Sequence, residues 1–198
     1  MSTVDTPAET AGPSGVKKPI RTGDDYIDSL RERDIRVFLM GELVQDPVEH
    51  PMIRPSINAM AATYDLAVEN PALATAQSSL SGRQVHRFLH VTESVDDVVM
   101  QNRMQRRLGQ ITGTCFQRCV GMDAFNSLYS VTYEIDEAHG SDYHTRFRNF
   151  VAMTQSAGYV IGGAMTDVKG DRSKAPHQQS DPDLYVHITR RTDEGVYV

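Results

Sequence analysis

Apolar residues recur at spacings of three and four along most of the chain, a period that is typical of amphipathic helices. The longest stretch of this kind, Gly113 to Asp136, carries apolar residues on more than one side and predicts a single long, buried helix. The same period predicts four further helices, at about 22–30, 52–70, 94–108 and 142–157. Thr22 and Ser94 are residue types that cap helix starts, and Gly140 and Gly158 are expected to end helices.

Other apolar runs predict strands. The segment Arg36 to Val44 is divided by Gly41 and predicts a short hairpin, and Gly82 to Val91 is expected to be extended. Near the end of the chain, strands are predicted at 159–166, 183–190 and 195–198. The predicted fold is therefore mainly α: a helical N-terminal domain followed by the start of an antiparallel β domain.

This pattern divides the chain into three parts. Residues 1–21 are rich in Ser, Thr, Ala, Gly and Pro and are expected to form a disordered arm. Residues 22–157 form the predicted helical domain, and residues 158–198 begin the β domain. A sheet that stops at Val198 would leave an unpaired edge, so we expect truncation there or a partner that covers this edge.

The only two cysteines, Cys115 and Cys119, lie four residues apart in the longest predicted helix. Residues at this spacing share a helix face, so the two thiols are expected to point the same way. Two interpretations follow from spacing alone. The thiols are either small buried core residues or half of a site for a soft metal such as zinc, copper(I) or an iron–sulfur cluster. A disulfide is disfavoured because cysteine is sparse and no secretory signal precedes it.

Composition narrows the function classes. The net charge is -6 and the pI is about 5.6, which argues against binding to nucleic-acid phosphates as the main activity. No apolar run reaches the length of a membrane span, and no secretory signal is recognisable. These features and the unpaired thiols predict a cytoplasmic protein.

Several polar residues are candidates for binding. The turn-like sequence after the strand predicted at 159–166 combines a hydroxyl, a glycine and two cations, Lys169 and Arg172, a combination that suits a phosphate-bearing ligand. His86 and His90 are better explained as ordinary loop or strand residues than as ligands. Three arginines of the helix predicted at 94–108 could face an acidic coenzyme tail, but the preferred interpretation is a solvated face or salt bridges to Asp and Glu: Arg103, Arg106 and Arg107.

Four stretches carry a resemblance to a known family: TCFQRCVGMDAFNSLYSVTYEID, HPMIRPSINAMAATYDLA, MQRRLGQ and GGAMTDVKGDR. They resemble the 4-hydroxybutyryl-CoA dehydratases, flavin and iron–sulfur enzymes related to 4-hydroxyphenylacetate 3-hydroxylases. The resemblance runs from about Thr22 to the last residue and implies a helical domain of the acyl-CoA dehydrogenase type.

The resemblance also implies two cofactors. Cys115 and Cys119 match two ligands of a four-iron–four-sulfur (4Fe-4S) cluster, whose other ligands, a histidine and a cysteine, lie beyond the point matching Val198. One segment matches residues that line the FAD site: Met165, Thr166, Asp167, Val168, Lys169, Gly170, Asp171 and Arg172. Val168 departs from the family, which commonly has proline there, so the turn is expected to be less rigid.

The implied reaction converts 4-hydroxybutyryl-CoA to crotonyl-CoA, often with vinylacetyl-CoA isomerase activity. FAD serves as a transient one-electron acceptor, and the cluster acts as a Lewis acid on the departing hydroxyl. The family's catalytic base lies beyond Val198, so no catalytic residue is assigned. The expected partners are an acyl-CoA substrate and either further copies of the chain or a complementary C-terminal chain.

Two alternatives remain open at this point. One is the oxygenase component of a reduced-flavin-dependent aromatic monooxygenase of the 4-hydroxyphenylacetate type, which would bind flavin without iron. The other is an inactive fragment of a split gene that only folds or pairs with a second chain.

Overall fold

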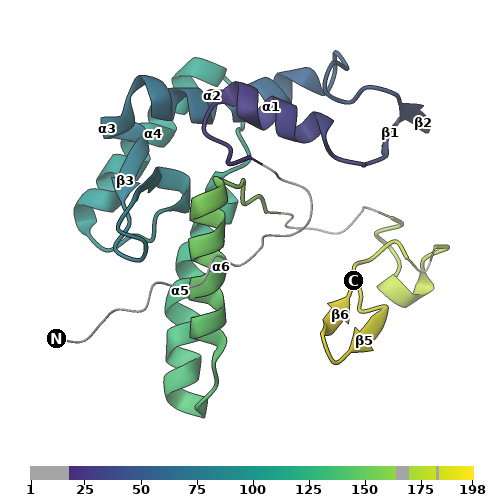
Figure 1. Ribbon diagram of the computed structural model, residues 1–198. Helices are drawn as coiled ribbons and strands as arrows, with labels where there is room; N and C mark the ends of the chain where they lie inside the picture. The colour runs from purple at the N-terminus through teal and green to yellow at the C-terminus, as the bar shows by residue number, and fades with distance from the viewer. Residues whose placement is uncertain (1–17, 164–169, 182) are drawn as a thin grey trace. The chain divides into compact units, whose positions relative to one another are not determined.

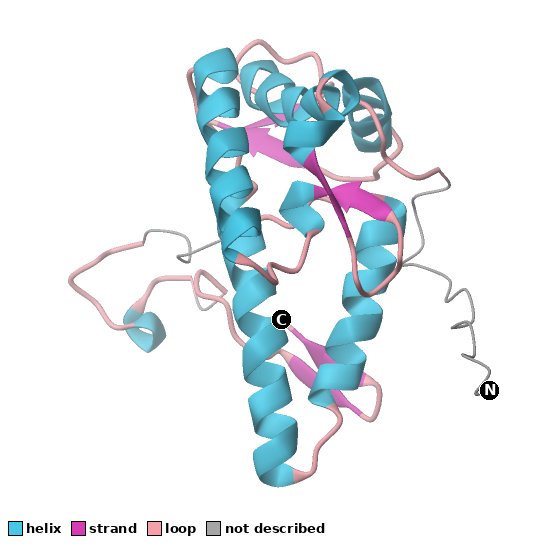
Figure 2. Cartoon of the chain, turned by 90° about the vertical axis from the view of Figure 1, so that its left-hand side faces the viewer, coloured by secondary structure: helices cyan, strands magenta, loops and turns pink. Residues whose placement is uncertain are grey.

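The computed structural model describes residues 18–163, 170–181 and 183–198. These residues form two compact units, Met1–Gly162 and Gly163–Val198, and each unit is described by itself. The first unit is mainly helical, as the sequence predicts, and α5 and α6 lie side by side in it as an antiparallel pair (Figures 1 and 2).

Six α-helices are described in the first unit: α1 Gly23–Arg31, α2 Arg54–Glu69, α3 Pro71–Ala74, α4 Val95–Thr112, α5 Cys119–His139 and α6 Tyr143–Ala157. Two antiparallel hairpins and one 3-10 turn accompany them: β1 Val37–Leu39 with β2 Glu42–Val44, β3 Thr75–Gln77 with β4 Gln84–His86, and η1 Arg87–Leu89.

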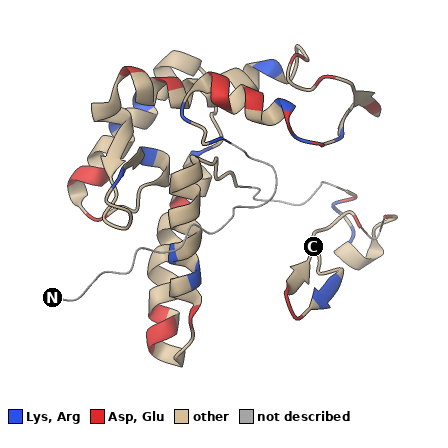
Figure 3. Cartoon of the chain, viewed as in Figure 1, with Lys and Arg blue, Asp and Glu red and all other residues tan. Residues whose placement is uncertain are grey.

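The predicted helix ends are confirmed where a capping residue was recognised. Thr22 accepts a hydrogen bond from the Asp25 amide, and the Asp25 carboxylate accepts one from the Thr22 amide, which completes a capping box. Figure 3 shows the acidic residues that gather on α1. Ser94 also caps its helix, α4, because its hydroxyl accepts a hydrogen bond from the Asp97 amide. Gly140 and Gly158 end α5 and α6 with φ of 64° and 71°, a left-handed conformation that favours glycine.

The prediction of one long helix over 113–136 is wrong. Gly113 adopts a φ of 60° and ends α4, and residues 114–118 form a loop in which Gln117 also has a positive φ of 55°. A left-handed residue cannot continue a right-handed helix. Cys115 therefore lies in the loop and Cys119 is the first residue of α5, so the two thiols do not share a helical face as predicted.

The expectation that this helix is buried nearly all round is also wrong. Within α5 only Gly121, Met122 and Phe125 are buried. Several of its large apolar side chains are exposed: Val120, Leu128, Val131 and Tyr133.

The predicted strands fare unevenly. The hairpin at 36–44 is confirmed, and its turn uses left-handed conformations at Met40 and Gly41. The segment 82–91 forms a strand only at β4, then turns into η1 and is extended again at His90, and its pairing with β3 was not predicted. Residues 159–163 form no strand, and the remainder of the strand predicted at 159–166 lies outside the described residues.

Three clusters of buried apolar side chains hold the first unit together. One joins α2, α3, α4 and the loop before α5 around Met104, Leu108 and Phe116. A second joins α1 to α2 around Ile27 and Ile57, and a third joins α5 to α6 around Phe125 and Val151. The loop that carries the cysteines is thus anchored directly in the core by Phe116.

The second unit has little regular structure. It contains the 3-10 turn η2 Pro176–Gln178 and one antiparallel hairpin, β5 Arg190–Thr192 with β6 Gly195–Tyr197. The prediction of a strand at 183–190 is wrong except at Arg190, which begins β5. The turn predicted after it and the strand predicted at 195–198 are confirmed, the strand as β6. Every described residue of this unit is exposed or half-buried, so burial does little to impose a longer strand.

Candidate functional site

The loop between α4 and α5 carries Cys115, and Cys119 follows it as the first residue of α5. Cys115 is exposed, Cys119 is half-buried, and neither forms a disulfide. The loop is short because Gly113 turns the chain sharply and Thr112 receives the Thr114 amide on its hydroxyl at 3.4 Å. The interpretation of both cysteines as buried core residues therefore does not hold, and accessible thiols suit reaction with a metal.

Two buried side chains of this loop, Phe116 and Arg118, anchor it in the first unit. Phe116 is buried against Phe88, with the ring centroids 5.5 Å apart. Arg118 is buried as well, with 1% of its surface exposed. Sequence reasoning missed Arg118, because a single arginine beside a cysteine carries no pattern that distinguishes a buried cation from an exposed one.

The described residues supply only part of a metal site. Among them, no group of three or more His, Cys, Asp and Glu side chains is arranged to hold a metal ion. A thiol pair leaves two positions of a four-ligand site open, and an exposed loop leaves room for ligands from elsewhere. The donor set therefore fits half of an iron–sulfur site.

The two histidines near this loop serve the fold. His86 accepts a hydrogen bond from the Phe88 amide on Nδ1, so its Nε2 carries the proton and donates to the Thr63 carbonyl at 2.9 Å. Burial, with the nearby Arg118 charge, holds the pKa of His86 well below its usual range. The Nε2 atom of His90 lies 3.2 Å from the Asp97 carboxylate.

The three arginines of α4 lie on an exposed face, in line with the preferred interpretation: Arg103, Arg106 and Arg107. On this face, Arg103 NH1 lies 3.9 Å from the Met100 thioether.

The segment predicted to line a flavin site is described only in part. Met165, Thr166, Asp167, Val168 and Lys169 lie outside the described residues. Gly170, Asp171 and Arg172 form a turn that Gln179 closes, since its side chain accepts from the Asp171 amide and donates to the Asp171 carbonyl. A Cβ at Gly170 would lie 2.2 Å from the Leu184 side chain and 2.5 Å from the Gln179 side chain, so a larger residue would require these two side chains to move. Arg172 is exposed, and its guanidinium suits a phosphate.

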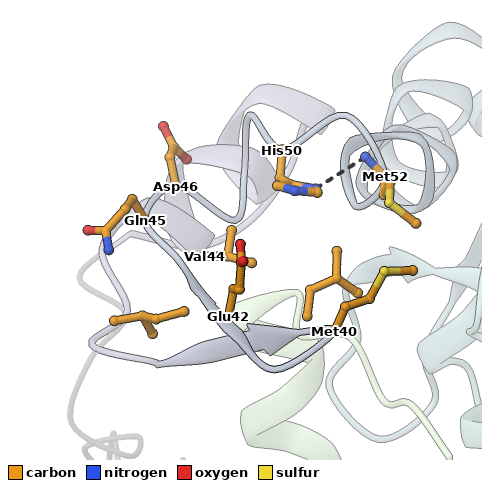
Figure 4. A pocket seen from close by; sticks show the side chains of 9 residues that line it. Met40, Glu42, Val44, Gln45, Asp46, His50 and Met52 are labelled. Atoms are coloured by element: carbon orange, nitrogen blue, oxygen red, sulfur yellow. Dashed lines mark hydrogen bonds between the residues drawn. The ribbon is translucent and has the colours of Figure 1, made fainter.

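A separate hollow of about 460 Å³ lies at the β1–β2 hairpin, shown in Figure 4. It is lined mainly by apolar and acidic side chains, and the His50 ring receives the Met52 amide at its edge. Neither cysteine lines it. This hollow was not predicted. The two methionines at and after the apolar segment 36–44, Met40 and Met52, are the sequence signal that could have indicated it.

These features define a class: a helical N-terminal unit with a surface thiol pair, in a fold shared with flavin-dependent oxygenases. A solved oxygenase component of 4-hydroxyphenylacetate 3-monooxygenase, complexed with FAD and 4-hydroxyphenylacetate, has a TM-score of 0.63 at 21% identity. The alignment covers 89% of this chain and 37% of that one, and at this identity it establishes the fold alone.

Residues 22–198 match the family model described as 4-hydroxyphenylacetate 3-hydroxylase N terminal, and the chain belongs to this family. Within it, the chain is 47% identical over 182 residues to the 4-hydroxybutyryl-CoA dehydratase/vinylacetyl-CoA isomerase of Clostridium aminobutyricum. It is 66% identical to a solved archaeal 4-hydroxybutyryl-CoA dehydratase from N. maritimus, with a TM-score of 0.81. The resemblance inferred from sequence is thereby confirmed.

Each comparison covers only part of the relative. The alignments include 90% of this chain but 37% of the Clostridium protein and 36% of the archaeal one. The chain therefore corresponds to an N-terminal part of these relatives and spans little more than a third of their length.

Proposed function

We propose that the chain is the N-terminal portion of a flavin and iron–sulfur dehydratase that converts 4-hydroxybutyryl-CoA to crotonyl-CoA, with vinylacetyl-CoA isomerase activity. The observation that carries the proposal is the identity of 47% and 66% to two 4-hydroxybutyryl-CoA dehydratases, against 23% to an oxygenase component from Geobacillus. The thiol pair, in which Cys115 is exposed and Cys119 half-buried, supports the same assignment.

In this proposal Cys115 and Cys119 provide two thiolate ligands to a 4Fe-4S cluster. The segment from Met165 to Arg172 lines the FAD, and Arg172 offers a guanidinium to a phosphate oxygen. When bound, the two cofactors supply one-electron chemistry and a Lewis acid for the departing hydroxyl. The described residues contribute ligands and positioning, and the remaining cluster ligands and the catalytic base belong to a further part of the enzyme.

The proposal requires the rest of the enzyme to be present as a covalent extension or a second chain. A cluster with two missing ligands is not expected to be stable in an exposed loop. The active assembly is thus expected to contain this chain, its C-terminal complement and an acyl-CoA substrate, in the cytoplasm and as an oligomer.

The test is the cofactor content of anaerobically purified protein. We would measure iron, acid-labile sulfide and flavin in the chain alone and in the chain co-expressed with the C-terminal part of a dehydratase. We expect iron and flavin together in the co-expressed sample, with dehydration of 4-hydroxybutyryl-CoA. Changing Cys115→Ser and Cys119→Ser together is expected to abolish bound iron and dehydration.

The other outcomes identify the alternatives. Flavin without iron, with hydroxylation of a phenol when a reductase is supplied, would indicate the monooxygenase. Neither cofactor in either sample would indicate a fragment that retains the fold but not the chemistry. Retention of iron in the double serine variant would contradict the assignment of the cysteines.

A further inference from the structure

Arg118, the last residue of the 114–118 loop, is a buried cation with an unusual environment. Its guanidinium lies 4.6 Å from the centroid of the Tyr64 ring and 5.0 Å from that of Phe88. Its NH1 donates to the Thr63 hydroxyl at 2.9 Å. These partners come from α2 and η1, so the arginine ties the start of α5 to two other elements of the first unit.

The surrounding aromatic rings form a continuous row. Tyr26 stacks on Tyr64, Tyr64 meets His86 edge-on, His86 stacks on Phe88, and Phe88 contacts Phe116, with centroids 5.4–5.7 Å apart. The last ring belongs to the cysteine loop itself. Phe116 and Arg118 are the first and last residues of the segment between the two cysteines. Both contact this aromatic row, which therefore holds the segment at its two ends.

Burial of the Arg118 guanidinium is expected to lower the stability of the fold. Arg118 Nε and NH2 have no hydrogen-bond partner among the described residues, and no ion pair of the described part includes Arg118. An unpaired buried cation is generally unfavourable, and well-packed apolar side chains often replace buried charges without loss of stability. Cation–π contacts with Tyr64 and Phe88 offset part of this cost. Stability alone therefore does not explain why an arginine occupies this position.

We propose that Arg118 is a positioning residue, which holds the loop of residues 114–119 so that the thiols of Cys115 and Cys119 are presented together to one metal centre. The inference rests on the proposed function, because it assumes that the thiol pair binds metal. Its physical basis is the rigidity of a planar guanidinium between two rings, with a directed hydrogen bond to Thr63. Partners that orient metal ligands typically change metal affinity 10–100-fold when they are removed.

The experiment is an anaerobic titration of the reduced 198-residue chain with Cd²⁺, followed by the ultraviolet cadmium–thiolate absorption. Wild-type protein is compared with R118M, R118K and the double variant C115S/C119S. R118M retains length and apolar character without the charge or the donors, and R118K retains the charge without the planar fork. Val151→Ala, a cavity-forming change in the cluster between α5 and α6, serves as a control of reduced stability.

We expect R118M to bind Cd²⁺ about 10–100-fold more weakly than wild type while its circular dichroism stays native. R118K is expected to be weakened as well, and V151A to keep wild-type affinity despite a lower melting temperature. If R118M does not fold, T63V removes the hydroxyl acceptor of Arg118 and is expected to weaken Cd²⁺ binding in the same direction.

The contrary results separate the two proposals. Wild-type affinity in folded R118M, or in folded T63V if R118M does not fold, would overturn the role of Arg118 and leave the dehydratase assignment intact. Affinity that follows melting temperature across all variants, V151A included, would reduce Arg118 to a purely structural residue. A wild-type titration that matches C115S/C119S would refute the thiol pair as a metal half-site in this chain, and the role of Arg118 with it, whereas the dehydratase assignment is decided by the cofactor content of the co-expressed protein.

Discussion

Single residues at the start of α1 show how one carboxylate stabilises several parts of the chain. Asp25 accepts hydrogen bonds from the amides of Arg21 and Thr22, each at 3.0 Å, and lies 2.5 Å from the Lys18 ammonium. These contacts, the bond to Lys18 above all, lower the pKa of Asp25 to about 2 despite partial burial. The ionised carboxylate is therefore the form that the fold favours.

This shift predicts a pH dependence of stability. Because the pKa of Asp25 in the folded chain is below its usual value of 3.8, the ionised group stabilises the fold above about pH 4. That contribution disappears as the pH falls towards 2. Asp25→Asn is expected to lower the free energy of unfolding by about 0.3–1 kcal/mol at pH 7, the range for acidic groups at a helix N-terminus.

Urea titrations at pH 7 and at pH 2.5 measure the effect. The difference between Asp25→Asn and wild type should shrink at the lower pH. Asp24→Asn, on the exposed side of the same turn, is the matched control and should change stability less. Equal effects of the two variants at both pH values would contradict the interpretation.

Two helical glycines, Gly121 and Gly109, differ in how closely other parts of the chain approach them. Gly121 lies in the first turn of α5, and a Cβ there would come within 1.8 Å of the Ile161 carbonyl oxygen. Gly109 lies in the last turns of α4, and a Cβ there would meet nothing within 4 Å. One glycine thus permits close packing of a helix against a returning backbone, whereas the other only adds conformational freedom to a helix.

The same substitution is therefore expected to have opposite effects at the two positions. Gly121→Ala should destabilise the first unit by about 1–3 kcal/mol, because a backbone atom must move. Gly109→Ala should stabilise it by about 0.5–1 kcal/mol, because alanine is the better helix former. Thermal unfolding of both variants beside wild type tests this; destabilisation by both changes, or by neither, would count against the described packing.

Much of the element order was predictable because local chemistry determines it. Thr22, Ser94, Gly140 and Gly158 mark helix ends by capping and by left-handed backbone, which depend on neighbouring residues only. The break at Gly113 was missed because apolar residues continue at helical spacing on both sides of it. What interrupts the helix is the burial of Phe116 and Arg118 against η1, a contact between segments distant in sequence.

The candidate site was predictable to a smaller extent. The cysteine pair was identified by residue type, yet its presentation depends on the Arg118 environment, to which Tyr64 and Phe88 contribute from elsewhere in the chain. The strand predicted at 183–190 failed for a related reason: apolar alternation specifies a strand only where one face is buried.

At the scale of the whole molecule, the buried residues concentrate in one unit. The three core clusters all lie between Tyr26 and Ile161, and no described residue of the second unit is buried. The first unit therefore contains the interactions that make folding cooperative.

Among the described residues, no helix is both long and apolar enough to cross a membrane.

A fragment of residues 18–162 is accordingly expected to fold by itself. Its free energy of unfolding should lie within about 1 kcal/mol of that of the full chain, or about 2–4 °C in melting temperature. Residues 163–198 alone should show no cooperative transition. Circular dichroism melts of the three proteins measure this, and loss of the transition in the longer fragment would show that the second unit stabilises the first.

The entry and exit of the first unit lie beside each other. The Ile20 amide donates to the Ala157 carbonyl at 2.9 Å, the Arg21 guanidinium reaches the Ser156 carbonyl, and the Tyr64 hydroxyl donates to the Gly158 carbonyl. A unit whose two ends are adjacent can be inserted into another chain or circularly permuted with little strain. Residues 20–162 therefore form a segment that recombination could exchange between relatives as one piece, carrying the thiol pair and the aromatic row together.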